Sequence, residues 1–166
     1  DPKNITLGDA ADASGWNYNG IIGLGYTGGK NLDTSGVFSN GDNAGRAVAL
    51  NAAGDRMAIG ALFANASEIG GSVSNSGKVF LFSFSDNTFS GGALNATIGL
   101  NENFLAEGLS VSDNFGASVA FNGTGDRLAV GAMGDDFANV DEDETGAKAG
   151  AVYLFSFTDT NGAISN

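Results

Sequence analysis

The sequence predicts an all-β fold made of two four-stranded, antiparallel units of similar sequence. The first observation is a duplication, because residues 42–61 and 113–132 are identical at 12 of 20 aligned positions. The second is composition: 27 glycines among 166 residues, mixed with short β-branched and aromatic runs, are typical of strands joined by tight turns. The third is that no segment has an apolar stripe with the 3.6-residue period of a helix.

The duplication continues beyond this first block. GKVFLFSFSD at residues 77–86 and GAVYLFSFTD at residues 150–159 share 7 of 10 residues. The copies are 71 residues apart in the first block and 73 in the second, so the insertion falls in the intervening loop, where insertions are tolerated. We therefore divide the chain into an N-terminal segment (residues 1–35), a first repeat (36–101) and a second repeat (102–166).

Each repeat contains three strand-like runs in the same order. The first run, RAVALN or ASVAFN, ends in a polar turn, NAAGD or NGTGD, whose residue types tolerate positive φ. The second run is RMAIGA or RLAVGA, and the third is KVFLFSF or AVYLFSF. A fourth run, ALNATIGL at residues 93–100, follows in the first repeat only.

The third run has apolar side chains on both faces. Alternation along a strand places a column of aromatic residues on one face and two aliphatic residues on the other, Val79 and Leu81 in the first repeat and Val152 and Leu154 in the second. We therefore expect both third strands to lie between two apolar layers. The aromatic column either packs in the core or offers a platform for a ligand. The two columns are Phe80, Phe82 and Phe84, and Tyr153, Phe155 and Phe157.

The second repeat lacks a fourth strand, and the N-terminal segment contains a matching one. NGIIGL at residues 19–24 follows the pattern of NATIGL at residues 95–100. Because an open sheet edge pairs readily with another strand, we expect the N-terminal strand to complete the last unit of its own chain or of a neighbouring chain. The residues predicted at this assembly contact are Ile21, Ile22, Leu24 and Tyr26 on one strand, and Val152, Leu154, Phe155 and Phe157 on the other.

Residues 113–136, DNFGASVAFNGTGDRLAVGAMGDD, followed by GAVYLFSF, resemble the FG-GAP repeat of integrin-α-type β-propellers and of large bacterial surface proteins. Phe115–Gly116 matches the FG of the name and Gly131–Ala132 matches the GA, while Met133 stands where the family favours proline. In the first repeat, Ala44–Gly45 replaces FG and Leu62 follows the second motif.

The resemblance implies four-stranded blades packed face to face in an extracellular or cell-surface protein. A β-propeller needs about 4–8 blades, so two blades do not close a ring. The resemblance therefore leaves three arrangements open: part of a longer array, an assembly of several chains, or a small sandwich. Many members carry a calcium loop between their first two strands. Here Asp55 and Asp126 are the only carboxylates in that turn, so we expect no metal there.

An acidic loop follows the second run of the second repeat, with six acidic residues between Asp135 and Thr145. It either binds calcium, the one cofactor that we expect to be possible, or is a solvated loop that discourages association between sheet edges. The candidate calcium ligands are Asp113, Asp135, Asp136, Asp141 and Asp143. The corresponding loop of the first repeat carries Leu62, Phe63 and Ile69 instead, which either form an interface or cover the end of their own sheet.

Composition narrows the function. The net charge of −12 disfavours binding to nucleic acid or to an anionic membrane, and the absence of histidine and cysteine removes the usual general base and any thiolate site. We therefore expect a structural or adhesive extracellular module, not an enzyme, whose partner is itself in a homo-oligomer or filament, or adjacent repeats of a longer chain. The alternative is a calcium-dependent adhesion domain that binds a cell-surface protein or a glycan. A glycosidase would need two converging carboxylates, which the clustered acidic residues do not provide.

Overall fold

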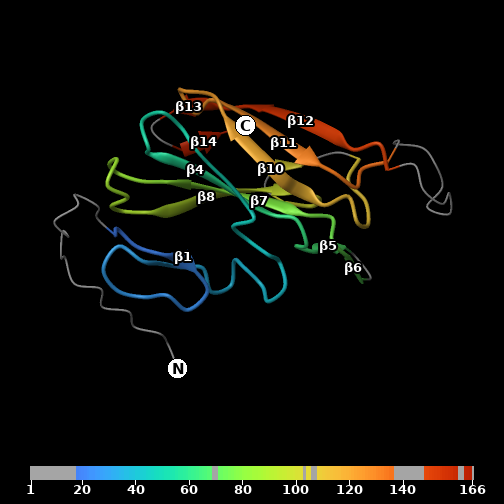
Figure 1. The fold of residues 1–166 in the computed structure, drawn as a ribbon, viewed down its shortest axis with the longest axis horizontal. Coiled ribbons are helices and arrows are strands. Elements are labelled where there is room, and N and C mark those ends of the chain that lie inside the picture. The colour runs from blue at the N-terminus through green and yellow to red at the C-terminus, as the bar shows by residue number, and fades with distance from the viewer. Residues whose placement is uncertain are drawn as a thin grey trace.

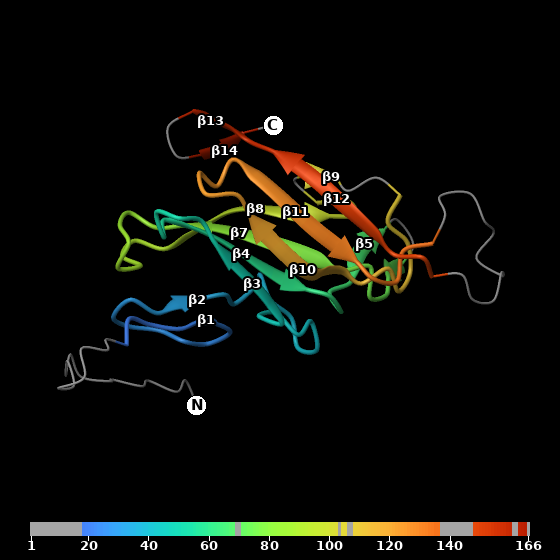
Figure 2. The ribbon, with the colours of Figure 1, turned by 45° about the horizontal axis from the view of Figure 1, so that its top comes forward.

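The computed structural model describes residues 18–68, 71–102, 104–105, 108–136, 148–160 and 163–165. All regular structure in these residues is β-strand, which confirms the all-β part of the predicted fold class. Two sheets pack on one another, and a small N-terminal layer lies on the far side of the first sheet (Figures 1 and 2). The described part of the chain contains no helix that could span a membrane.

The first sheet contains the four strands predicted for the first repeat and one more. Neighbours are antiparallel from β3 to β8, whereas the short β9 pairs with β8 in parallel. In sheet order the strands are β3 (Ala47–Leu50), β4 (Arg56–Ala61), β7 (Lys78–Ser83), β8 (Ala93–Gly99) and β9 (Phe104–Leu105).

The second sheet contains the three strands predicted for the second repeat. They are antiparallel, in the order β10 (Phe115–Phe121), β11 (Arg127–Ala132) and β12 (Ala151–Ser156). Within the described residues, β12 pairs with β11 alone, so its outer edge lacks the neighbour that β8 provides to β7. The chain then forms a separate hairpin from β13 (Thr158–Thr160) and β14 (Ala163–Ser165), which the sequence did not predict.

Two further strand pairs lie outside these sheets. A hairpin of β5 (Ala66–Glu68) and β6 (Gly71–Val73) occupies the loop between β4 and β7. In the N-terminal layer, β1 (Ile22–Gly23) pairs in parallel with β2 (Leu32–Asp33). The N-terminal strand therefore does not complete the second sheet of its own chain, and that alternative of the prediction is wrong. Pairing with a neighbouring chain stays a prediction.

Each large sheet has an aromatic face and an aliphatic face, and both sheets are stacked in the same sense. The aromatic face of the first sheet, with Phe80 and Phe82, packs against the N-terminal layer, where Phe38 lies 4.8 Å from Phe80 between ring centroids. Its aliphatic face, with Val79 and Leu81, packs against the aromatic face of the second sheet. The aromatic columns are thus core residues, as the packing interpretation predicted.

The aliphatic face of the second sheet points outward. Val152 and Leu154 are 68% and 80% exposed, whereas their counterparts Val79 and Leu81 are fully buried. The prediction that both third strands lie between apolar layers is therefore correct for β7 and wrong for β12. The reason is positional: among the described residues, no layer follows the second sheet in the stack.

Candidate assembly surfaces

The contact between the two repeats is centred on the Phe-Gly pair that begins β10. Phe115 is fully buried, and its ring makes edge contacts with Tyr153 and Phe155 of its own sheet at centroid distances of 5.3 and 6.1 Å. The backbone N–H of Phe115 donates to the carbonyl oxygen of Ser76, at 3.0 Å, in the first repeat. The beginning of β10 is thereby fixed to the loop that precedes β7.

Glycines make this contact close. A Cβ atom at Gly77 would collide with the carbonyl oxygen of Phe115, and one at Gly60 would collide with the carbonyl oxygen of Gly116. Gly77 also has φ +87°, a conformation that other residues adopt only with strain. Each glycine therefore allows two backbones to approach where no side chain fits.

A second set of contacts joins the polar turns of the two repeats. The backbone N–H of Ala52 donates to the carbonyl oxygen of Gly123 at 3.0 Å. The guanidinium of Arg56 donates to the carbonyl oxygen of Gly125 at 3.2 Å. The turn of the second repeat is thus bonded to the turn of the first, and the charged end of Arg56 satisfies a backbone acceptor.

The second repeat keeps the residues that receive these contacts in the first. Arg127, Gly131 and Gly150 occupy the positions of Arg56, Gly60 and Gly77 in the aligned repeats. The side chain of Arg127 is 60% exposed and bonds its neighbour Asp126. At Gly150 the nearest heavy atom to an added Cβ is 3.5 Å away, so the space that Phe115 fills at Gly77 is open here.

The N-terminal layer reproduces the outermost part of the first sheet. Ile22 pairs in parallel with Leu32, as Ile98 of the matching NATIGL run pairs in parallel with Phe104. In each case the paired isoleucine packs against the aromatic face of the sheet that follows it along the chain. The likeness of residues 19–24 to residues 95–100 therefore extends to local structure and to position, and β1 stands where a fourth strand of a preceding sheet would stand.

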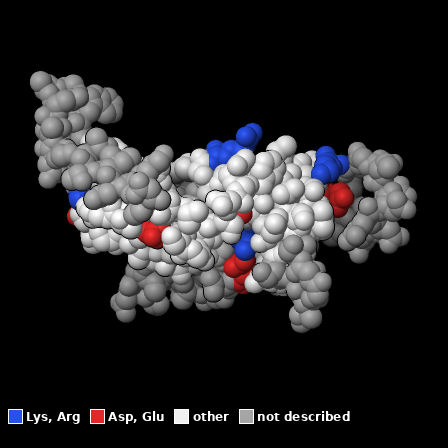
Figure 3. Space-filling model, turned by 90° about the horizontal axis from the view of Figure 1, so that it is seen from below, with Lys and Arg blue, Asp and Glu red and all other residues white. Residues whose placement is uncertain are grey.

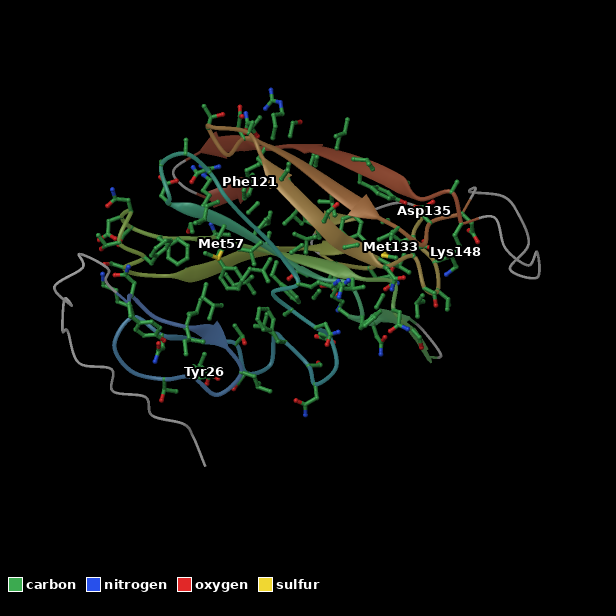
Figure 4. All side chains as sticks on the ribbon, viewed as in Figure 1. Tyr26, Met57, Phe121, Met133, Asp135 and Lys148 are labelled. Atoms are coloured by element: carbon green, nitrogen blue, oxygen red, sulfur yellow. The ribbon has the colours of Figure 1, made fainter. Side chains whose placement is uncertain are left out.

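The N-terminal layer leaves the edge strand β3 and the Met57 end of β4 partly uncovered in the first sheet. Val48 and Leu50 of β3 are 51% and 43% exposed on the aromatic side. An open cleft of about 440 Å³ lies between these strands and the N-terminal layer, lined by residues that include Tyr18, Val48 and Met57. Figure 4 shows Met57 between the first sheet and this layer.

The predicted calcium ligands divide into three groups. Asp113 is buried and accepts hydrogen bonds from the backbone N–H and hydroxyl of Ser110, at 2.5 and 3.1 Å, so it closes a turn. Burial, with repulsion from Asp135 and Asp136, raises the pKa of Asp113 above its ordinary value. Asp135 accepts a hydrogen bond from the Tyr153 hydroxyl at 2.6 Å, which with burial raises the pKa of Tyr153.

Asp136 is exposed, and Asp141 and Asp143 lie outside the described residues. In the part of the chain that the structure describes, no three acidic residues are arranged to hold a metal ion. Figure 4 places Asp135 beside Met133 and Lys148 at the end of the second sheet where the acidic loop leaves.

The turn aspartates accept hydrogen bonds from side chains of their own turns. Asp126 accepts hydrogen bonds from the side chains of Asn122 and Thr124, both at 2.6 Å, and these bonds lower the pKa of Asp126. Asp55 likewise accepts from the side chain of Asn51 at 2.7 Å. Both carboxylates therefore serve to close their own turns.

The predicted assembly residues lie in three places. Leu62 is buried and its carbonyl accepts from the Asn114 side chain at 3.2 Å, whereas Phe63 is 40% exposed. Ile69 lies outside the described residues. The other residues are in the N-terminal layer or on the second sheet: Leu24 is exposed, Ile21, Ile22, Tyr26 and Phe155 are half-buried, Phe157 is buried, and Val152 and Leu154 are exposed.

Sequence reasoning did not identify the residues of the contact between repeats, Arg56, Gly60 and Gly77. A signal was present, because each of them recurs at the aligned position of the second repeat. A glycine or arginine retained in both copies of a short phrase points to backbone approach or to a fixed hydrogen bond.

In a comparison with known protein families, residues 101–155 match the model of the FG-GAP repeat. This segment includes the Phe-Gly pair, β10, β11 and most of β12, and it confirms the resemblance drawn from the sequence. No curated protein matches the chain. FG-GAP repeats typically occur in extracellular or surface proteins, and the match indicates an adhesion-type module.

Proposed function

Starting from an FG-GAP repeat that packs on the first sheet, which has the same design, we propose that this chain is a structural or adhesive module of an extracellular surface or filament. We further propose that copies of the chain assemble by strand complementation. One observation carries this proposal: among the described residues, β12 has an open edge, while β1 in the N-terminal layer matches a fourth strand and pairs only with β2.

The first sheet supplies the register for such a pairing. In it, Val79 of β7 pairs with Ile98 of β8, and Lys78 pairs with Gly99. Transferring these pairs through the aligned residues places Val152 of one copy opposite Ile22 of the next. The outer edge of β12 would gain an antiparallel neighbour, which removes an exposed row of backbone donors and acceptors.

For this to happen, β1 does not need to leave the aromatic face of its own first sheet. Ile22 packs on that face as Ile98 packs on the second sheet, while Ile98 also belongs to the sheet before it. A strand in this position serves two sheets at once. The proposed role therefore requires no catalytic residue and no cofactor.

A disulfide experiment tests the proposed register. The chain contains no cysteine, so two introduced cysteines report one contact without background. In the double variant Ile22→Cys, Val152→Cys, mild oxidation is expected to give a ladder of linked chains on a non-reducing gel. The matched control is Ile22→Cys with Ser156→Cys, because position 156 is four residues along the same face and lies beyond the reach of a disulfide.

Equal ladders from both pairs would mean random collision, and no ladder from Ile22→Cys, Val152→Cys would refute strand complementation in this register. Each variant is compared with the unaltered chain by circular dichroism, so that loss of the fold is recognised. Linked species of monomer mobility would indicate that β1 reaches β12 of its own chain, which also contradicts the proposal.

The alternative function is calcium-dependent adhesion through the acidic loop. What favours it is the group of Asp113, Asp135 and Asp136 at one end of the second sheet, close enough for the latter two to raise the pKa of Asp113. Against it, two of these carboxylates already bond Ser110 and Tyr153. Calcium binding stays a prediction, which the effect of calcium on association and on the thermal midpoint tests.

A further inference from the structure

We propose that copies of this chain stack head to tail, with the outward aliphatic face of the second sheet in one copy packed on the uncovered aromatic side of β3 in the next. The partner is thus a second copy of the chain, and the contact repeats the one already present between the two sheets. The choice of partner rests on the proposed function, but the contact uses other residues than the strand edge.

The contact inside the chain is the template. The aromatic side of the second sheet lies on the aliphatic side of the first sheet, and β10 makes the contacts with β3 and β4. Both sheets face the same way, so the stack has two different ends. One end presents an aliphatic face, and the other presents an aromatic face on which the N-terminal layer covers β4 and β7 and leaves β3 exposed.

The aliphatic end is equipped to receive a further sheet. Val152 and Leu154 occupy the positions of Val79 and Leu81, which the second sheet buries completely in the template. Exposed apolar side chains at adjacent positions on one face of a strand are typical of an interface. Arg127, Gly131 and Gly150 repeat the arginine and the two glycines of the template, as the aligned repeats show.

The aromatic end is equipped to dock. Gly45 and Asn43 have φ of +95° and +54°, close to the +86° and +57° of their counterparts Gly116 and Asn114 in the template. A Cβ at Gly45 would meet nothing within 4 Å, so the space that the first sheet fills at Gly116 is open at Gly45. Val48 lines the open cleft beside Gly45 and is half-exposed.

One residue differs, and it sets the strength of the contact. Ala44 stands where Phe115 stands in the template, so the docking end lacks the ring that is buried between the sheets of one chain. Less apolar surface is therefore buried between copies than within a chain. We expect reversible association whose extent depends on protein concentration.

Both proposed contacts form in one arrangement. The β1–β2 pair has the same relation to the first sheet as the β8–β9 pair has to the second. Docking one copy on the next by the template would therefore bring β1 to the open edge of β12. Because the two surfaces differ, the contact is heterologous, and repeating it gives an open stack or a closed ring.

Two substitutions test the stacking without touching the edge of β12. Ala129 lies on the central strand β11 at the position of the fully buried Ala58, and Val48 lies at the opposite end of the stack. Ala129→Arg and Val48→Lys are each expected to abolish association of the chain, measured by sedimentation velocity over a hundredfold range of concentration. Circular dichroism and urea unfolding check that each variant keeps its fold.

Mixing the two variants is the decisive experiment. Each keeps one intact surface, so equal amounts of Ala129→Arg and Val48→Lys are expected to form a one-to-one dimer and nothing larger. A symmetric contact between two aliphatic faces would instead let Val48→Lys associate with itself and leave Ala129→Arg monomeric in the mixture, and that result would overturn the proposal. An unaltered chain that stays monomeric throughout would overturn it too.

The cysteine pair separates this inference from the proposed function. If Ala129→Arg leaves association unchanged while the Ile22–Val152 disulfide forms, strands are exchanged and the face-to-face contact is wrong. If Ala129→Arg and Val48→Lys abolish association, but the variant Ile22→Cys, Val152→Cys without either substitution never forms the disulfide, the stacking holds and strand complementation is wrong.

Discussion

Replacing Gly77 by alanine is expected to destabilise the chain strongly, because two costs coincide at this residue. Its φ of +87° costs about 1–2 kcal/mol for any residue with a Cβ. The added methyl would also collide with the backbone of Phe115, and overpacking of this kind costs typically about 1–3 kcal/mol. The expected loss in the free energy of unfolding is therefore about 2–5 kcal/mol, a large share of the stability of a domain.

Gly150 provides a matched control within the same chain. It has a similar φ of +73°, but an added Cβ would have its nearest neighbour at 3.5 Å, an ordinary contact distance. Gly150→Ala should therefore lose only the strain of about 1–2 kcal/mol. The difference between the two variants measures what the close approach of the repeats contributes.

Urea unfolding followed by circular dichroism gives both values, at a concentration where the chain is monomeric so that Gly150 is not part of a contact between copies. Equal losses in the two variants would refute the reasoning, because they would show that only backbone strain, and not contact with Phe115, demands glycine at position 77. A loss at Gly150 larger than at Gly77 would refute it more strongly.

Three other outcomes are expected. Because the pKa of Asp113 is raised in the folded chain, the folded chain retains a proton that the unfolded chain releases. The free energy of unfolding of the unaltered chain, relative to that of Asp113→Asn, should therefore fall as the pH rises above 3.8. Urea unfolding between pH 3 and 7 measures this difference, and a difference that stays constant with pH would contradict the prediction. Removing calcium with EDTA should leave association and the thermal midpoint unchanged. A thermal midpoint that rises with added calcium, and no longer does so in the double variant Asp135→Asn, Asp136→Asn, would favour the alternative function. Since each copy carries a net charge of −12, salt should strengthen association by screening the repulsion between copies, and weaker association at 0.5 M than at 0.05 M NaCl would argue for a polar contact instead.

The sequence predicted the strands well because each lies in a short, repeated phrase with strong local signals. The bounds of β4 and β11 coincide with RMAIGA and RLAVGA, since a polar turn precedes each run and the alternation of side chains is clear. The hairpin of β13 and β14 was missed because its residues, TDT and AIS, have no pattern that separates a strand from a loop.

The burial of β12 could not be predicted from β12 itself. AVYLFS and KVFLFS have the same pattern, yet Leu154 is exposed and Leu81 is buried. Local pattern determines which residues share a face, whereas position in the stack determines whether that face is covered. The same limit applies to Gly60 and Gly77, whose role depends on the backbone of another repeat.

Charge and shape act in opposite directions on the proposed assembly. The face in Figure 3 shows few charged side chains and no dense cluster of either sign on its described part, so the charge on that face is spread thinly. Spread charge is screened by salt at physiological strength within about 8 Å, whereas contact between apolar faces is not.

A stack of sheets that all face the same way always ends in two unlike surfaces, and a chain must cover both or use them. Here the N-terminal layer covers β4 and β7 at the aromatic end with Ile22 and Phe38, and leaves Val48 of β3 exposed. The aliphatic end, with Leu154, has no cover among the described residues. A chain selected to be an isolated monomer would gain stability by burying these residues or by making them polar. Complementary apolar surfaces at opposite ends, beside an edge that is unpaired among the described residues and a strand that matches it, are what the proposed addition of one copy to another requires.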